Sequence, residues 1–65
     1  MIAVNDKTIQ FYEGMTIAEA IQEAGEMIDH MTIIMQDKTI IQYNQIDKKI
    51  SDGTSLRILR ILSGG

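Results

Sequence analysis

The sequence has no cysteine, no proline and no tryptophan, and its one histidine is His30. Without cysteine the chain can form no disulfide bond and offers no thiolate to a structural zinc ion. It also has no thiol nucleophile, and no spacing of Ser51 or Ser55 with His30 predicts a catalytic triad. We therefore interpret His30 as a loop residue, and we predict neither an enzyme nor a metal site.

Basic residues and long apolar runs are also scarce. Six Lys and Arg residues stand against nine Asp and Glu residues, which gives a net charge of −3. Proteins that bind nucleic acid or anionic membranes normally carry a basic patch, so we expect neither partner. No apolar run approaches the roughly 20 residues of a membrane-spanning helix, and no segment has the pattern of a signal peptide. We expect a cytoplasmic protein.

What is present is one small, apolar domain. The chain has 65 residues, of which 45% are hydrophobic. A chain of this size buries only roughly 60% of its unfolded surface, so its core is thin and depends on regular packing. We assign residues 1–62 to this domain and residues 63–65 to a flexible tail.

Residues 1–12 are predicted to form a β-hairpin. Large apolar side chains alternate with other residues, which is the period of a strand with one buried face. They are Ile2, Val4, Ile9 and Phe11. A turn centred on Asp6-Lys7 pairs Asn5 with Thr8, Val4 with Ile9 and Ile2 with Phe11. All four apolar side chains then share one face.

A helix is predicted over about residues 16–25. Thr16 followed by Glu19 three residues later forms a capping box, and Gly25 suits the left-handed position that ends a helix. Apolar residues recur at the spacing of one helical face. They are Ile17, Ala20, Ile21, Ala24 and Ile28.

The second half of the chain is predicted to contain three strands. They are residues 31–36, a short strand at 39–42 after an Asp37-Lys38 turn, and residues 55–62 after an Asp52-Gly53 turn. Residues 43–49 have no clean period, but Ile46 can fill the core. The whole chain then reads as an α+β domain of the β-grasp type, with a sheet of four to five strands and one main helix. The first and last strands lie parallel at the centre of the sheet, which keeps the connections short.

The predicted core contains one face of each element. It comprises Ile2, Val4, Ile9, Phe11, Ile17, Ile21, Ile33, Met35, Ile40, Ile50, Leu56 and Ile58.

The other face of the sheet is predicted to carry an apolar patch. With Leu56 and Ile58 inward, Arg57, Leu59 and Ile61 point outward. With Ile33 and Met35 inward, Ile34 also points outward. The patch of Ile34, Leu59 and Ile61, flanked by Arg57 and Arg60, is interpreted as a partner-binding surface. The alternatives are a register shifted by one residue, or coverage of the patch by residues 43–49.

The last strand runs without a gap into Ser63-Gly64-Gly65. Glycine has no Cβ, so this tail is narrow enough to enter the active site of another protein. The alternative is an ordinary frayed terminus.

The whole chain resembles the ThiS/MoaD family of ubiquitin-like sulfur carriers, most closely the ThiS branch of thiamin biosynthesis. The resemblance lies in the strand-turn-strand start, the capped helix, the Asp52-Gly53 turn and the final apolar strand that leads to Gly64-Gly65. It implies that the carboxylate of Gly65 is adenylated and converted to a thiocarboxylate, with Ser63 and Gly64 as the flexible tail.

The resemblance also implies the partners. They are an E1-like adenylyltransferase of the ThiF/MoeB type, a persulfide sulfur donor, and a sulfur-accepting synthase of the ThiG type. ATP and its metal belong to the partner, so no cofactor is expected on this chain, which we expect to be a monomer when free. Two alternatives stay open: a MoaD-like small subunit of molybdopterin synthase, and a non-covalent β-grasp module whose Gly-Gly end is incidental.

Overall fold

The computed structural model describes residues 1–29 and 31–60, with the exception of the Arg60 side chain. Within these residues lie five strands, one α-helix and one 3-10 helix. The strands are β1 (Ile2–Val4), β2 (Lys7–Ile9), β3 (Thr32–Gln36), β4 (Thr39–Ile41) and β5 (Ser55–Arg60). The helices are α1 (Ile17–Glu23) and η1 (Tyr43–Gln45).

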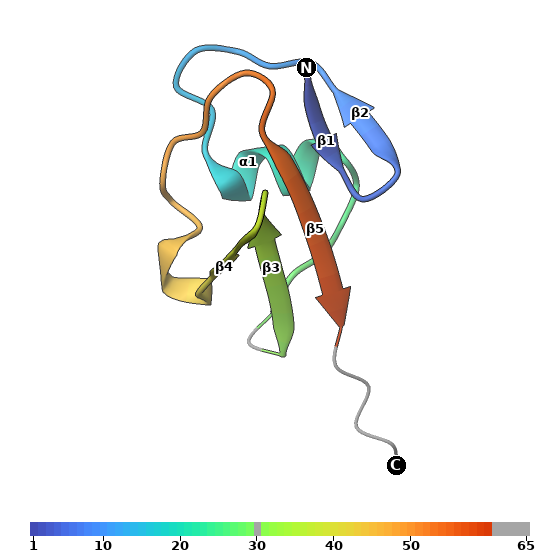
Figure 1. Ribbon diagram of the computed structural model, residues 1–65, viewed down its shortest axis with the longest axis vertical. Helices are drawn as coiled ribbons and strands as arrows, with labels where there is room; N and C mark the ends of the chain where they lie inside the picture. Colours follow the sequence, from blue (N-terminus) through green and yellow to red (C-terminus); the bar gives the residue numbers. More distant parts are fainter. Residues whose placement is uncertain (30, 61–65) are drawn as a thin grey trace.

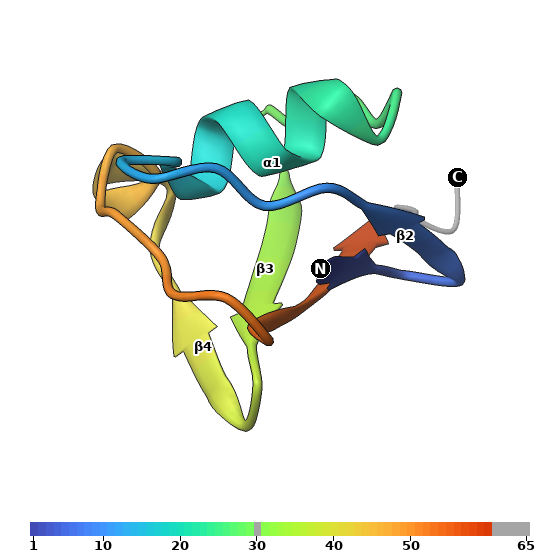
Figure 2. The ribbon, with the colours of Figure 1, turned by 90° about the horizontal axis from the view of Figure 1, so that it is seen from above.

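The strands form one mixed sheet in the order β2-β1-β5-β3-β4 (Figure 1). β5 lies in the middle and is parallel to β1 and antiparallel to β3. α1 lies across one face of the sheet, as Figure 2 shows, and no helix of the described residues lies on the opposite face. The predicted α+β class, the β-grasp arrangement and the parallel central pair are therefore confirmed.

The first hairpin forms, but its predicted register is wrong. Val4 pairs with Lys7 and Ile2 pairs with Ile9, so the register differs by two residues from the predicted one. The turn begins at Asn5, which has a φ of 56°. Asparagine enters this left-handed region more readily than most residues do, which places the turn at Asn5-Asp6. Because the shift is even, Ile2 and Val4 still face the core.

The start of α1 is built as the sequence predicts. The backbone N–H of Glu19 donates to the Thr16 hydroxyl at 3.2 Å, and the Thr16 N–H donates to the Glu19 carboxylate at 3.0 Å. This reciprocal capping box satisfies two helix-end groups that otherwise lack partners. The helix end is also confirmed, since Gly25 has a φ of +78°.

The segment after η1 completes the helix start. The N–H groups of Ile17 and Ala18 donate to the carbonyls of Lys48 (3.0 Å) and Ile46 (2.8 Å). These two donors have no partner within the helix itself, so the returning chain supplies one. Ile46 is half-buried against the core, as predicted. Residues 43–49 therefore stabilise the start of α1, a role that their sequence pattern does not predict.

The end of α1 is held by a residue from β2. The Lys7 ammonium donates to the carbonyl of Ala24 at 2.9 Å and lies 3.6 Å from a Glu26 carboxylate oxygen. α1 has no basic residue in its own last turn. Lys7 therefore supplies the positive charge that the negative end of the helix dipole favours.

The core lies between α1 and the sheet. Its buried hydrophobic residues are Ile2, Val4, Met15, Ile17, Ala20, Ile21, Ala24, Ile34, Ile41, Ile50, Leu56 and Ile58. The predicted core residues Ile9 and Phe11 are half-buried and pack against it. The prediction is wrong for Ile33, Met35 and Ile40, because β3 and β4 turn their other faces to the helix.

Candidate functional site

β5 organises the candidate site. It pairs with β3 over five residue pairs, from Leu56 to Arg60, and its sequence continues directly into residues 61–65. Five predicted site positions lie outside the described part: the Arg60 side chain, Ile61, Ser63, Gly64 and Gly65. The described residues therefore give the strand and the surface that precede the tail.

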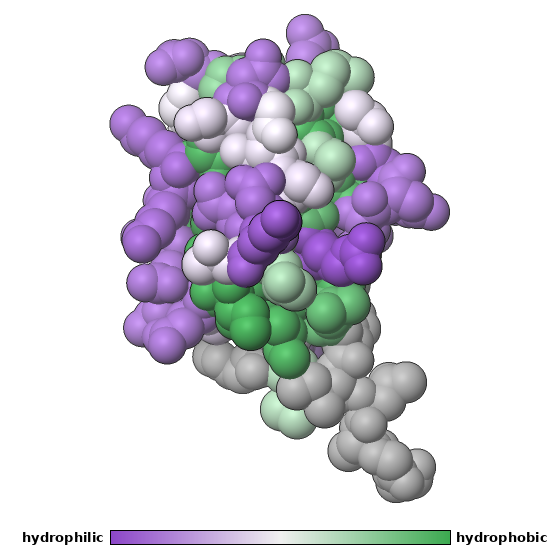
Figure 3. Space-filling model, viewed as in Figure 1, coloured by the Kyte–Doolittle hydropathy of each residue, from purple (hydrophilic) through white to green (hydrophobic). Residues whose placement is uncertain are grey.

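An apolar patch lies on the sheet face opposite the helix. We call it the open-face patch, and it consists of Ile33, Met35, Ile40 and Leu59. Ile33 pairs across the sheet with Leu59, and Met35 pairs with Ile40, so the four side chains share one face. Ile40 is 65% exposed and Leu59 is 43% exposed, while Ile33 and Met35 are half-buried. Figure 3 shows hydrophobic surface gathered in the lower half of this face.

The prediction that Ile34 lies in this patch is wrong. Ile34 is fully buried, and its cross-strand partners Ile41 and Ile58 are buried with it. Apolar residues fill positions 33, 34 and 35 in succession, so alternation alone does not select the inner face. Thr32 can turn inward because its hydroxyl hydrogen-bonds with the Asp29 carboxylate at 3.1 Å.

Leu59 and Arg57 are exposed on the open face, as expected; their role in partner binding stays a prediction. Sequence analysis missed Ile33, Met35 and Ile40. The turn spacing does place Met35 and Ile40 on one face, but it leaves open whether that face is inner or outer. The contact of Thr32 with Asp29 and the packing across the sheet favour the observed face.

A shallow depression borders the patch on the β1 side. Its volume is about 420 Å³, and it is lined by Asn5, Asp6, Arg57 and Leu59. Arg57 lies beside Met35 in the sheet, and it forms no ion pair with any residue that the structure describes. The depression therefore combines one apolar side chain with one positive and one negative group.

Asn5 joins the first hairpin to β5 beside this depression. Its backbone N–H donates to the carbonyl of Leu56 at 2.9 Å. Its side-chain Oδ1 accepts from the backbone N–H of Ile58 at 2.8 Å. The side-chain oxygen of Asn5 thus replaces a backbone carbonyl as the acceptor for β5, one residue beyond the end of β1.

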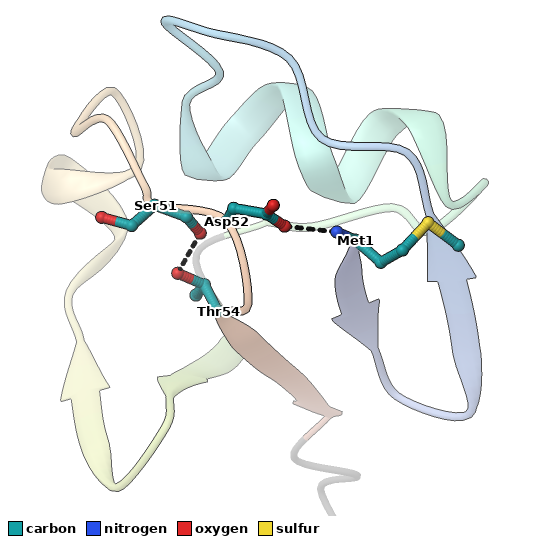
Figure 4. A network of polar contacts seen from close by, with 4 residues as sticks. All are labelled: Met1, Ser51, Asp52 and Thr54. Atoms are coloured by element: carbon teal, nitrogen blue, oxygen red, sulfur yellow. Dashed lines mark hydrogen bonds and ion pairs between the residues drawn. The ribbon is translucent and has the colours of Figure 1, made fainter.

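The loop that enters β5 is fixed at the other end of the strand (Figure 4). The Asp52 carboxylate pairs with the amino group of Met1, and the Thr54 hydroxyl donates to the carbonyl of Ser51 at 2.7 Å. The contact with the amino group holds the pKa of Asp52 below its usual value. This corner shapes the start of β5 and does not border the open-face patch.

The other perturbed groups belong to the capping of α1. Hydrogen bonds from the Thr16 backbone and hydroxyl hold the pKa of Glu19 below its usual value. Desolvation, aided by the nearby Glu19, raises the pKa of Tyr12. None of these shifted groups lines the depression at β5. The described residues at β5 therefore present an exposed apolar patch and a depression, and the three shifted groups lie elsewhere.

The remaining findings are absences. Among residues 1–29 and 31–60, no three His, Asp or Glu side chains gather as a metal site. No helix in those ranges is long and apolar enough to cross a membrane. No protein-family model matches the chain, and a search of curated proteins finds no match. A function is therefore inferred from the fold, from β5 and from the residues themselves.

Proposed function

We propose that the chain is a sulfur carrier of the ThiS/MoaD kind, with Gly65 as the last residue of the active protein. An E1-like enzyme of the ThiF/MoeB type adenylates the Gly65 carboxylate, and a persulfide donor then supplies the sulfur. The product is a thiocarboxylate that passes its sulfur to an acceptor. Thiazole synthesis for thiamin, by a synthase of the ThiG type, is the first candidate, and the location is the cytoplasm.

One observation carries the proposal. The central strand of a β-grasp sheet leads in sequence into Ser63-Gly64-Gly65, and the same strand contributes Leu59 to an exposed apolar patch. A small domain has few apolar residues to leave on its surface, so such a patch favours a protein partner. A partner that covers the open-face patch would also be close to the end of β5.

The chemistry needs no catalytic side chain on this domain. The α-carboxyl group has an ordinary pKa of about 3.5, so it is ionised at neutral pH and can attack the α-phosphorus of ATP. Pyrophosphate leaves, and AMP becomes a good leaving group on the acyl carbon. The terminal sulfur of a persulfide then displaces AMP. Cleaving the remaining S–S bond requires a thiol, which the partner must supply because this chain has no cysteine.

Intact-protein mass spectrometry tests the proposal. The chain is incubated with an enzyme of the ThiF/MoeB type, ATP, Mg²⁺ and a persulfide donor. We expect one oxygen to be replaced by sulfur, and fragmentation should place the sulfur at Gly65. Exchange of labelled pyrophosphate into ATP reports separately whether the enzyme adenylates the chain. An unchanged mass with an enzyme that catalyses this exchange contradicts sulfur transfer.

A chain that lacks Gly65 is the control. It should keep the circular dichroism spectrum and the melting temperature of the full chain, but it should acquire no sulfur. A shift in melting temperature would show that the tail contributes to the fold.

Two alternatives are distinguished by related measurements. A MoaD-like subunit would form a stable complex with the large subunit of molybdopterin synthase and pass its sulfur there. A non-covalent module would bind its partner through the open-face patch, whether or not Gly65 is present. Joining of Gly65 to lysines would appear as conjugates on a denaturing gel.

A further inference from the structure

The two sides of β5 are unequally paired. On one side, β3 accompanies it from Leu56 to Arg60. On the other side, the pairing with β1 stops at Val4 and Leu56. The last part of β5 therefore has a neighbouring strand on one side only, although β5 is the central strand of the sheet.

The hydrogen bonds show which backbone groups point to each side. The carbonyl of Ser55 accepts from Asp37 at 2.7 Å, so odd-numbered residues of β5 direct their backbone groups toward β3. The carbonyls of Thr54 and Leu56 accept from Ala3 (3.1 Å) and Asn5 (2.9 Å), so even-numbered residues point toward β1. The carbonyl of Ile58 and the N–H of Arg60 consequently point to the side where β1 has ended.

Asn5 is the reason that β1 ends there. Its positive φ turns the chain away from β5, and its side-chain oxygen accepts a hydrogen bond from the N–H of Ile58. The carbonyl of Ile58 and the N–H of Arg60 remain, and no described residue pairs with either of them. Free backbone groups along a strand, such as these two, are a template for pairing with another chain.

These two groups match one residue of a parallel strand. In a parallel ladder, a residue donates its N–H to one carbonyl and accepts from the N–H two residues farther along. Ala3 donates to the carbonyl of Thr54 in this way. An antiparallel partner would instead need the N–H and the carbonyl of the same residue. The N–H of Ile58 is already bonded to Asn5, so within the described strand an antiparallel partner could pair only with Arg60, its last residue.

We propose that the Ile58 carbonyl and the Arg60 N–H form a slot that accepts an extended segment of a partner protein, parallel to β5. We call it the β5 slot. The segment is recognised mainly through its main chain, as in other cases of strand addition. This recognition does not depend on the chemistry proposed for Gly65.

The depression beside the β5 slot specifies the side chains of the segment. Arg57 and Leu59 line it from β5, and Asn5 and Asp6 close its end. The Asn5-Asp6 turn occupies the plane of the sheet next to the β5 slot, so the segment approaches from the open face. Its apolar side chain then lies beside Leu59, and the polar residues next to it lie near the turn. A second copy of this chain is less suited, because its outer strands β2 and β4 are only three residues long.

Substitution of Arg60 isolates the proposed donor. Arg60→Pro removes the backbone N–H that faces the β5 slot. It costs no hydrogen bond to β3, because the backbone groups of even-numbered residues point away from β3. Arg60→Ala removes the same side chain but keeps the N–H, so it is the matched control. The two variants should have similar melting temperatures.

The probe is a displayed library of random linear dodecapeptides, selected against the immobilised full chain. An enriched peptide is then synthesised and titrated against the wild type, Arg60→Ala and Arg60→Pro. We expect Arg60→Pro to bind at least tenfold more weakly than Arg60→Ala. We also expect NMR to show slower exchange of the Arg60 amide and contacts of a parallel register between peptide and β5.

Several outcomes overturn the proposal. They include the absence of any enriched peptide, equal affinity for the two Arg60 variants, contacts that map to β2 or β4 or that show an antiparallel register, and a wild-type chain that dimerises through β5. A melting temperature of Arg60→Pro well below that of Arg60→Ala would show that the N–H of Arg60 is already bonded, and would also overturn it.

Discussion

The side chain of Asn5 accepts a hydrogen bond from the backbone N–H of Ile58 at 2.8 Å. This contact joins the first turn of the chain to its last described strand, 53 residues apart in sequence. It keeps β5 fixed beyond the end of β1 and close to the point where residues 61–65 begin. Asn5 therefore links the position of the hairpin to the position of the proposed carrier tail.

Substituting Asn5 should lower stability in two separable steps. Asn5→Gly keeps the positive φ available but leaves the Ile58 N–H without its acceptor, and we expect a loss of about 1 kcal/mol in the free energy of unfolding. Asn5→Ala adds the cost of a left-handed alanine, for a total loss of about 2 kcal/mol. Urea denaturation followed by circular dichroism measures both values. Equal stability of Asn5→Ala and the wild type would show that neither the acceptor nor the turn conformation matters.

The two hairpins show why strand register was the weak point of the sequence prediction. The tetrapeptide Asp-Lys-Thr-Ile occurs at residues 6–9 and again at residues 37–40. In the second copy, Asp37 takes the positive φ, whereas in the first copy the preceding Asn5 takes it. The turn therefore starts one residue earlier in the first hairpin. Ile9 ends half-buried against the core, while Ile40 is 65% exposed.

Features with a local physical cause could be predicted. The capping box depends on the spacing of Thr16 and Glu19, and the helix end depends on Gly25, so both follow from short stretches of sequence. The parallel central pair follows from the order of the elements. The inner face of β3 could not be predicted in this way, because it depends on the contact of Thr32 with Asp29 and on packing across the whole sheet.

Two adjacent isoleucines in β3 test the corrected faces. Ile34→Ala should lower the free energy of unfolding by about 2–5 kcal/mol, because Ile34 is fully buried. Ile33→Ala removes the same atoms from a half-buried position on the open face, and we expect a loss of less than about 1.5 kcal/mol. Chemical denaturation of both variants gives the comparison. A larger loss for Ile33→Ala would reverse the assignment of inner and outer faces.

Glu19 should make stability depend on pH in a predictable direction. Its pKa in the folded chain lies below the unfolded value, since the Thr16 backbone and hydroxyl hydrogen-bond to the ionised carboxylate. The resulting stabilisation is present above the unfolded pKa of about 4.3 and is lost as the pH falls through the lower folded pKa. Glu19→Gln should therefore be less stable than the wild type at pH 7, and this difference should shrink at pH 3.

The control for that measurement is Glu23→Gln on the same helix. The Glu23 side chain has no hydrogen bond or ion pair to a described residue, so its replacement should not change the pH dependence in the same way. Urea midpoints at both pH values measure the differences. A difference between Glu19→Gln and the wild type that stays constant with pH would mean that the capping carboxylate does not titrate in this range.

Leu59→Glu separates partner binding from stability on the strand that leads to the tail. Leu59 is 43% exposed and lies opposite Ile33 on the open face, so the substitution should lower the free energy of unfolding by less than about 1 kcal/mol. It places a charge in the open-face patch, and a partner that covers the patch would have to desolvate that charge. We expect the rate of adenylation of Gly65 by the E1-like enzyme to fall at least tenfold.

Thr8→Glu is the matched surface control, because Thr8 is exposed on β2 at the far edge of the sheet. It should leave both the melting temperature and the adenylation rate close to the wild-type values. An equal loss of adenylation in both variants would point to net charge as the cause. A Leu59→Glu chain that unfolds would show that Leu59 serves the core, whereas a folded chain with normal adenylation would remove the open-face patch from the proposed interface.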